Sequence, residues 1–233
     1  MTTVAQVRQA VRPLLERNCD LALVGRLIVI KPVHHLLCGI YVARSPNPLL
    51  FEPTWSVLLL SDVQRDFGFL WGERVRGRQG YWLTTDPDVS SAMCEAIEQE
   101  ALAPMRSIKT FDDFIDLASR LRNPRRHLDL FPIARLTVDI ARGDIVAAEA
   151  ICEYLKTKAG KSEYFLAQER YERAMQGLVP LVAANDRKGL ANLLHSYEAQ
   201  SVKTLKIEKY WERTPFPIEL ESGTSSKAAQ QPP

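Results

Sequence analysis

The sequence has little of what marks a membrane, secreted or metal-binding protein. None of its hydrophobic runs approaches the roughly 18 residues that a membrane-spanning helix needs. Its first residues lack the basic and apolar regions of a signal peptide. The four cysteines, Cys19, Cys38, Cys94 and Cys152, lie far apart and form no Cys-x-x-Cys pair, so neither a zinc site nor a disulfide framework is indicated. We therefore expect a soluble cytoplasmic protein with no membrane partner.

A strong excess of one charge is also missing. The chain carries 30 Lys and Arg against 28 Asp and Glu, a formal net charge of +2. Nucleic-acid-binding proteins usually have a large positive excess, so nucleic acid is not the expected partner unless a local basic patch provides the charge. No motif has a spacing that dictates a chemistry. We accordingly predict no cofactor, no metal site and no catalytic residue from the sequence.

Residues 21–61 are the most strand-like part of the chain. Three runs rich in Val, Ile, Leu and aromatic residues, at 27–30, 36–42 and 55–60, are separated by turn formers that include Pro32 and Pro53. Strands this short and this close leave no room for the long crossovers of a parallel sheet. Their hydrophobicity is nearly continuous, which predicts a sheet covered on at least one face and partly on the other.

Residues 67–85 predict a hairpin, with the strands GFLWGERV and GYWLTT joined through residues 76–80. Helical periodicity predicts helices over residues 4–17, 87–102 and 111–121, and helices throughout from residue 125. We expect Asp86 to cap the second of these helices, with Pro87 at its first position and Pro104 after its end. The predicted fold is α+β: an antiparallel sheet of about five strands covered by helices, followed by an all-helical C-terminal part. We divide it into an α+β domain (1–122), a helical domain or extension (126–212) and a disordered tail (213–233) that is rich in proline and poor in large apolar residues.

Two blocks of the helical part resemble each other at an offset of 43 residues. The offset pairs Ala141 with Ala184, Ala148 with Ala191, Ile151 with Leu194 and Tyr154 with Tyr197. A helical array normally needs three or more repeats to bury its faces. The similarity is therefore either a duplicated helical hairpin or chance.

His34, His35 and Cys38 are the residues in the strand-like region that could carry chemistry. In a strand, His34 and Cys38 would lie roughly 13 Å apart, which is too far for a nucleophile and its base. Adjacent residues of a strand point to opposite faces, so His34 and His35 would not bind one metal together. We expect Cys38 to be a buried, unreactive core residue.

A basic and aromatic group of residues stands out in the predicted hairpin. In an extended backbone Arg74, Arg76 and Arg78 share one face, and the aromatic residues Trp71, Tyr81 and Trp82 flank them. Such a face suits the binding of a protein or a single nucleic-acid strand. The favoured alternative is a solvated sheet edge whose arginines pair with Glu73, Asp66 and Asp62. A second basic cluster, Arg120, Arg122, Arg125, Arg126 and His127, fits either a charged helix end or a phosphate contact.

The order of the predicted elements, together with Trp82, Asp86 and residues 107–118, resembles a family of small bacterial α+β domains. Some members of that family are associated with polymorphic-toxin immunity. The resemblance covers residues 4–122, and this chain has about a hundred further residues beyond it. It implies a role in binding rather than in catalysis.

From the sequence we expect a cytoplasmic bacterial interaction protein that binds another macromolecule, with a protein as the expected partner. Two alternatives stay open. One is an enzyme whose polar residues come together only in three dimensions, and the other is a nucleic-acid binder that uses the two arginine clusters. A deep pocket with convergent His, Asp or Cys side chains would favour the enzyme, and a shallow aromatic patch would favour the binder.

Overall fold

The strand-like runs of the sequence form one antiparallel sheet in the computed structural model, which describes residues 2–43, 47, 49–63, 67–77, 80–163 and 167–221. The strands follow the order β1-β2-β3-β4-β5. They are β1 (Leu21–Val24), β2 (Leu27–Ile30), β3 (Leu36–Ala43), β4 (Leu50–Leu59) and β5 (Trp71–Arg74), and the short β6 (Trp82–Leu83) also pairs with β4. The predicted α+β class and the sheet of about five strands are confirmed.

The central pair of the sheet is β3 and β4, which run in register from Leu36 opposite Leu59 to Ala43 opposite Glu52. Strand β5 continues the sheet beyond β4. Its Gly72 lies so close to β4 that an added Cβ would overlap the backbone carbonyl of Trp55. A side chain at position 72 would therefore push β5 away from the sheet.

The predicted hairpin of residues 67–85 is wrong in its pairing. The two strands β5 and β6 do not pair with each other but with successive stretches of β4, with Thr54 opposite Arg74 and Phe51 opposite Trp82. Because β4 is ten residues long, it offers backbone partners to both. A side chain joins the two strands instead, since the indole Nε1 of Trp82 donates to the carbonyl of Val75 at 3.0 Å.

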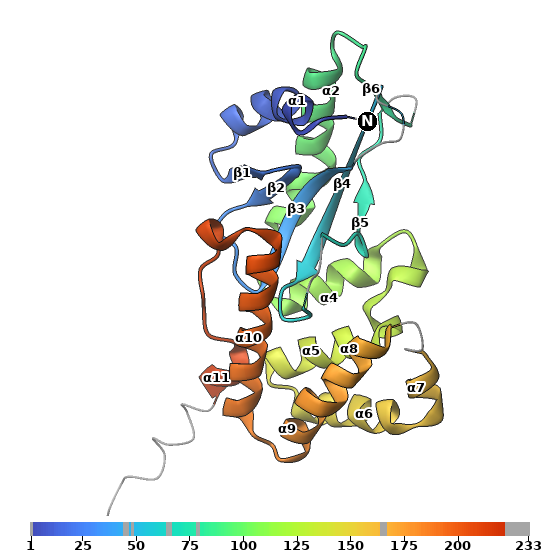
Figure 1. Cartoon of the computed structure of the whole chain (residues 1–233), viewed down its shortest axis with the longest axis vertical. Helices are drawn as coiled ribbons and strands as arrows, with labels where there is room; N and C mark the ends of the chain where they lie inside the picture. The colour runs from blue at the N-terminus through green and yellow to red at the C-terminus, as the bar shows by residue number, and fades with distance from the viewer. Residues whose placement is uncertain are drawn as a thin grey trace, which may run out of the picture.

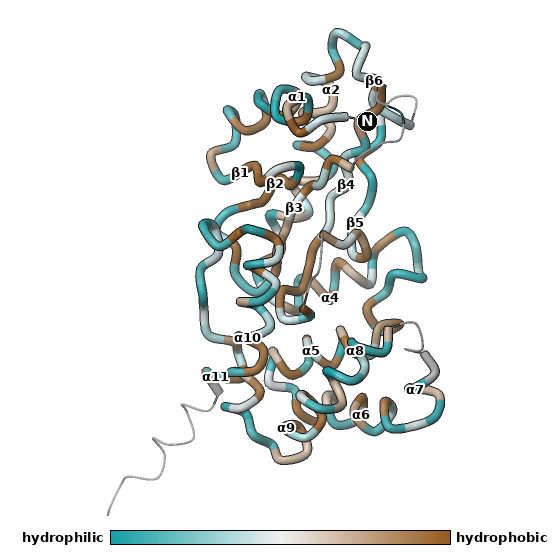
Figure 2. Tube along the Cα trace, in the orientation of Figure 1, coloured by the Kyte–Doolittle hydropathy of each residue, from teal (hydrophilic) through white to brown (hydrophobic). Residues whose placement is uncertain are grey.

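Helices pack on one face of the sheet and partly on the other, as the continuous hydrophobicity predicts. Helices α1 (Val4–Arg17), α2 (Val89–Ala96) and α4 (Phe111–Arg120) share the core of the first face, and Figure 1 shows α1 and α2 at the top of the molecule and α4 near its middle. The second face holds a smaller cluster with Val202 and Ile207, at and just after the end of α10 (Arg187–Leu205). In Figure 2 hydrophobic residues appear on β1 and β2 and also on helices such as α6.

The helix ends follow their capping residues in two cases and depart from the prediction in a third. Thr3 and Thr110 cap α1 and α4 through capping boxes. Asp86 makes a turn with Asp88, so α2 starts at Val89 rather than at residue 87. It also does not stop before Pro104, since a π-helical segment, η1 (Ile97–Leu102), carries it into α3 (Ala103–Arg106). Proline has no N–H for the usual helical hydrogen bond, and the changed hydrogen-bond pattern of a π-helical turn can accommodate a proline at this position.

The C-terminal part is helical, as predicted, and shares its hydrophobic core with the sheet. Its helices are α5 (Pro132–Arg142), α6 (Ile145–Lys156), α7 (Lys158–Glu163), α8 (Gln168–Arg173), α9 (Val179–Ala183) and α10, with the π-helical η5 (Ala174–Leu178) and the short 3-10 helices η2 (Pro124–Arg126), η3 (Leu128–Leu130) and η6 (Glu208–Tyr210). One cluster of buried residues extends from Val57 in the sheet through Phe114 to Leu194 in α10. Secondary structure changes near residue 122, but the core continues across that point.

The two similar helical blocks share a turn, at an offset that differs from the predicted one. Asp144 caps α6 and Asp186 caps α10, each with its side chain accepting from the backbone N–H three residues on. The preceding residues, Gly143 and Asn185, both have a positive φ. These equivalent positions are 42 residues apart, so the pairing at 43 residues is one residue out of register with the turn. The likeness lies in how the two turns are built.

The predicted disordered tail is wrong for its first residues. Residues 214–221, which we call the C-terminal segment, are ordered and end in the short helix α11 (Pro217–Glu221). Phe216 and Ile218 are completely buried in the main core. The proline-rich average composition hid these two large side chains, which are enough to anchor the segment. Residues 222–233 lie outside the described part of the chain.

We predict that a chain ending at Arg213 is less stable than a chain ending at Glu221. Only the shorter chain loses Phe216 and Ile218, and burying one such side chain contributes about 1.5–3 kcal/mol. Chemical denaturation of both proteins measures the difference. Equal free energies of unfolding would show that the C-terminal segment is not anchored.

Candidate functional site

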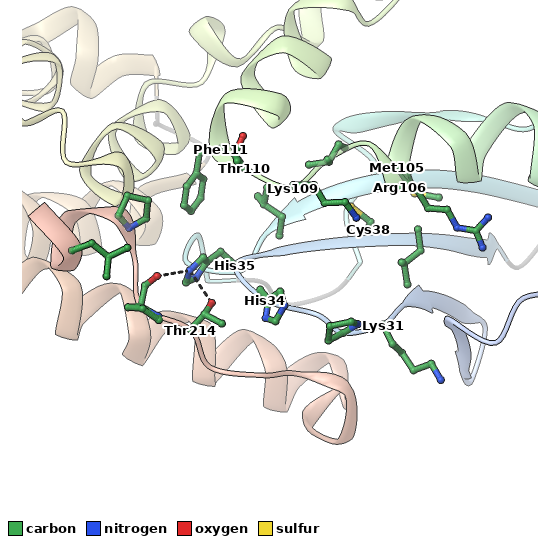
Figure 3. Close-up of a pocket in the computed structure, with 17 residues that line it drawn as sticks. Lys31, His34, His35, Cys38, Met105, Arg106, Lys109, Thr110, Phe111 and Thr214 are labelled. Carbon is green, nitrogen blue, oxygen red and sulfur yellow. Dashed lines mark hydrogen bonds between the residues drawn. The ribbon is translucent and has the colours of Figure 1, made fainter.

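A cavity of about 420 Å³ lies where the C-terminal segment meets the sheet. Its walls come from the loop between β2 and β3, the connection between α3 and α4, and residues 214–220 (Figure 3). Small-molecule sites typically have volumes of about 300–1,000 Å³, and this cavity falls in that range. It brings together residues that are far apart in the sequence.

His34 and His35 lie in the loop before β3 and not in a strand, which corrects the prediction for them. The loop is held by the last residue of η6 and by Glu212: the N–H of Val33 donates to Tyr210 O at 2.8 Å, and the N–H of Glu212 donates to Val33 O at 2.9 Å. The alternation of strand side chains therefore does not apply here. Both histidines line the same cavity (Figure 3).

His35 is held on both sides of its ring. Its Nδ1 lies 2.8 Å from Oε1 of Glu198, and its Nε2 lies 3.1 Å from Oγ1 of Thr214 and 3.3 Å from the carbonyl oxygen of Pro215. The ring stacks on Phe216 with the two centroids 4.0 Å apart. These contacts join the loop before β3 to α10 and to the C-terminal segment.

Glu198 is fully buried and contacts a second histidine. Its Oε2 lies 3.1 Å from Nδ1 of His195, whose Nε2 lies 2.9 Å from Oε2 of Glu219 in α11. We call His35, Glu198, His195 and Glu219 the histidine–glutamate chain. A buried carboxyl group is costly unless its oxygens are hydrogen-bonded, and here each oxygen of Glu198 faces an imidazole nitrogen.

The last member of this chain, Glu219, has a shifted pKa. Burial acts to raise the pKa, but hydrogen bonds from the backbone N–H of Phe216, at 2.6 Å, and from His195 outweigh that effect. The charge of nearby Arg213 and the electrostatic contribution of His195 act in the same direction, so the pKa of Glu219 lies below its usual value of 4.5. Glu219 is consequently ionised at neutral pH.

Positively charged side chains line the cavity, and the charges of Lys31 and Lys109 also act on the nearby carboxyl groups of Asp20 and Asp113. Within the described part of the chain, Lys31 and Lys109 line the cavity and make no ion pair, whereas Arg106 is paired with Asp20 at 2.7 Å. None of the described lining residues is Asp or Glu. The cavity thus presents two cationic side chains beside an otherwise largely apolar wall.

Cys38 lies in the cavity wall, and its sulfur is not activated. Burial raises the pKa of the Cys38 thiol to about 12, although the positive charge of Lys109 partly opposes this effect. A thiol with such a pKa is almost entirely protonated at neutral pH and is a poor nucleophile. The sequence-based expectation of an unreactive Cys38 agrees with this environment.

We predict that Cys38 reacts slowly with a thiol reagent in the folded protein at pH 8, because it is 8% exposed and its pKa is raised. Cys19 is exposed and serves as an internal control that should react quickly. Peptide mapping by mass spectrometry after timed alkylation gives both rates. Modification of Cys38 at the rate of Cys19 would contradict the prediction.

The aromatic residues predicted to flank the arginines are mostly not at the surface. Trp71 and Trp82 are buried, and Trp71 packs edge-on against Phe114 with the ring centroids 5.1 Å apart. Tyr81 is exposed. The structure therefore does not place the two tryptophans where a partner could contact them.

The structure describes two of the three arginines of this predicted face. Arg74 and Arg76 are exposed, and Arg78 lies outside the described residues. Arg74 pairs with Glu52 at 3.7 Å rather than with Glu73. What is left of the proposed binding face is Arg74, Arg76 and Tyr81, and their role in binding stays a prediction.

The predicted acidic partners of these arginines have other roles. Glu73 pairs with Arg122 at 3.5 Å, and Asp62 forms two hydrogen bonds with Arg170. Asp66 lies outside the described residues. In the second basic cluster, Arg126 donates to the carbonyl of Gly72 at 2.7 Å. Arg122 and Arg126 thus fasten the chain after α4 to β5.

The described residues contain neither a metal-binding cluster nor a candidate membrane-spanning helix. No group of three or more His, Cys, Asp and Glu side chains is arranged to hold a metal ion there. In the same part of the chain, no helix combines the length and the apolar character needed to cross a membrane.

Comparisons with protein-family models, with curated proteins and with solved structures found no match for this chain. The resemblance of residues 4–122 to immunity-associated domains therefore stays a prediction.

Sequence reasoning missed His195, Glu198 and Glu219. His35 and Glu198 are separated by 163 residues, so no local motif joins them. One signal was present: His195 and Glu198 lie on the same side of α10 as the core residue Leu194, where polar side chains need partners. Those partners could not be named before the fold was known.

Proposed function

We propose that the cavity beside His35 binds a small organic anion that has an apolar body. The observation that carries this proposal is the pair of cationic side chains, Lys31 and Lys109, facing a cavity without a described acidic residue in its wall. Charged side chains at a partly enclosed site attract an ion of opposite sign more strongly than they would in open water. An anionic group of the ligand would supply the missing charge.

The rest of the wall supports an apolar ligand body. Leu36, Met105, Ile108 and Phe111 line the cavity next to the lysines. Ligand sites are commonly lined by apolar and aromatic side chains with a few polar groups that fix the orientation of the ligand. An aromatic or branched carboxylate, sulfonate or phosphate monoester matches this combination of charge and surface.

This proposal and the expected macromolecular partner concern different surfaces. A partner protein would contact the exposed Arg74, Arg76 and Tyr81, which do not line the cavity. The cavity is preferred because it is formed by side chains from several elements and because its described wall carries cationic side chains and no acidic one. The two tryptophans that were predicted to belong to the arginine face are buried in the core.

We predict that salicylate binds the protein at least tenfold more tightly than salicylamide, its uncharged analogue. A charge-assisted hydrogen bond contributes about 1.5–3 kcal/mol, which corresponds to a factor of ten or more. Lys109→Met should remove this preference. Lys188→Met is the matched control, because Lys188 is exposed on α10 and does not line the cavity. Fluorescence or NMR titration measures the affinities, and equal binding of the two compounds would refute the proposal.

Catalysis in the same cavity is a second candidate function, favoured by the geometry of His35. A histidine oriented by a carboxyl group and 3.1 Å from a hydroxyl has the arrangement of a general base. On an ester such as acetylsalicylate, water would attack the acetyl carbonyl carbon and the ester C–O bond would break. The proton of that water would pass through His35 to the phenolate oxygen. The test compares the rate at which wild-type protein and His35→Gln release salicylate from acetylsalicylate. If wild-type protein binds acetylsalicylate but releases salicylate no faster than His35→Gln, this candidate function is removed.

A further inference from the structure

The C-terminal segment forms one wall of the proposed ligand site. Thr214, Pro215, Pro217 and Leu220 all line the cavity. Figure 3 shows Thr214 next to His35, on the side of the cavity opposite Lys109 and Arg106. Displacing this segment would open the cavity to solvent. The identity of the ligand rests on the proposed function, whereas the movement of the C-terminal segment is inferred from the structure alone.

The attachments of the C-terminal segment converge on one buried group. Thr214 contacts His35, and Glu219 contacts His195, and both histidines contact the carboxyl group of Glu198. Between these two polar contacts, Phe216 packs against both imidazole rings, with centroid distances of 4.0 Å to His35 and 4.6 Å to His195. The segment is thus held at two polar points on either side of one aromatic anchor.

We propose that the C-terminal segment is a pH-dependent closure of the ligand cavity, which is shut at neutral pH and opens in acid to release the bound anion. The contacts of Glu219 are the ones that we expect to weaken first when the segment opens. Oε2 of Glu219 accepts from the N–H of Phe216 and faces Nε2 of His195, so one atom joins the segment to itself and to α10. Loss of the charge on Glu219 weakens both contacts together.

The direction of the pH dependence follows from the contacts of Glu219. Its pKa in the folded protein is below the usual value of 4.5, because hydrogen bonds to the ionised form outweigh burial. A carboxyl group with a lowered pKa stabilises the folded arrangement above its ordinary pKa, and that contribution is lost as the pH falls through the lowered value. The segment is therefore held at neutral pH and loosens below about pH 4.5.

Other charged groups near α11 do not replace Glu219. His195 and Arg213 are the basic groups that act on the pKa of Glu219. Helix α5 also packs against α11, but its Arg135 and Arg142 are paired with acidic residues, Arg135 with Asp129 and Asp139 and Arg142 with Asp112 and Asp139. Because binding and closure are linked, a ligand that binds only the closed form must in turn stabilise the closed form by the same free energy.

Glu219→Gln tests the closure at neutral pH, where the variant keeps the size of the side chain and loses its charge. Hydrogen–deuterium exchange should show at least tenfold lower protection of the amides of residues 216 and 218–221 in the variant, with protection of α5 and α6 unchanged. Glu208→Gln is the matched control, because Glu208 is exposed in η6 and does not line the cavity. In wild-type protein the same residues should lose protection, corrected for intrinsic exchange rates, as the pH is lowered stepwise below 4.5.

The ligand half of the inference has a separate measurement. Salicylate should dissociate at least tenfold faster from Glu219→Gln than from wild type and from Glu208→Gln in stopped-flow experiments. If salicylate does not bind wild-type protein, the proposed function fails while the exchange experiment still tests the closure. Unchanged protection of residues 216 and 218–221 in Glu219→Gln would overturn the closure, and so would an equal loss of protection throughout the chain.

Discussion

The structure around the cavity depends on the burial of one carboxyl group. Glu198 is completely buried, and a buried carboxyl group is tolerated only when its oxygens are hydrogen-bonded. His35 and His195 provide those contacts, at 2.8 and 3.1 Å. This requirement fixes the loop before β3 against α10, and through the outer nitrogens of both rings it fixes the C-terminal segment as well. Removing one partner would leave a buried polar group unsatisfied, which costs more than the hydrogen bond itself contributes.

The sheet and the cavity are linked by the loop between β2 and β3. Strands β2 and β3 are held by the core, so the residues between them have little freedom, and backbone bonds from Val33 to Tyr210 and Glu212 restrict them further. His34 and His35 are thereby directed toward the cavity, while Cys38, a few residues on, is already inside the sheet with a raised pKa. The chain thus passes from polar side chains at His34 and His35 to an unreactive core residue at Cys38 within a few residues.

Local patterns in the sequence predict most of the fold and little of the site. The capping residues Thr3 and Thr110 mark two helices correctly, and the runs of Val, Ile and Leu mark the central strands, because these signals act over a few residues. The pairing of β6 with β4 and the burial of Phe216 depend on tertiary contacts that composition does not carry. The contact of His35 with Glu198 spans 163 residues, so the site was beyond any argument from spacing.

The central claim is that Glu198 holds two histidines and, through them, the wall of the cavity. Nitrogen–proton NMR of the imidazole side chains tests it directly, because a ring N–H that is hydrogen-bonded to a buried carboxyl group exchanges slowly with water and gives a visible signal. The account predicts slowly exchanging ring N–H signals for both His35 and His195 at neutral pH, and their joint loss in Glu198→Leu. Ring protons of His35 and His195 that exchange as fast in the wild-type protein as those of a free histidine would contradict it.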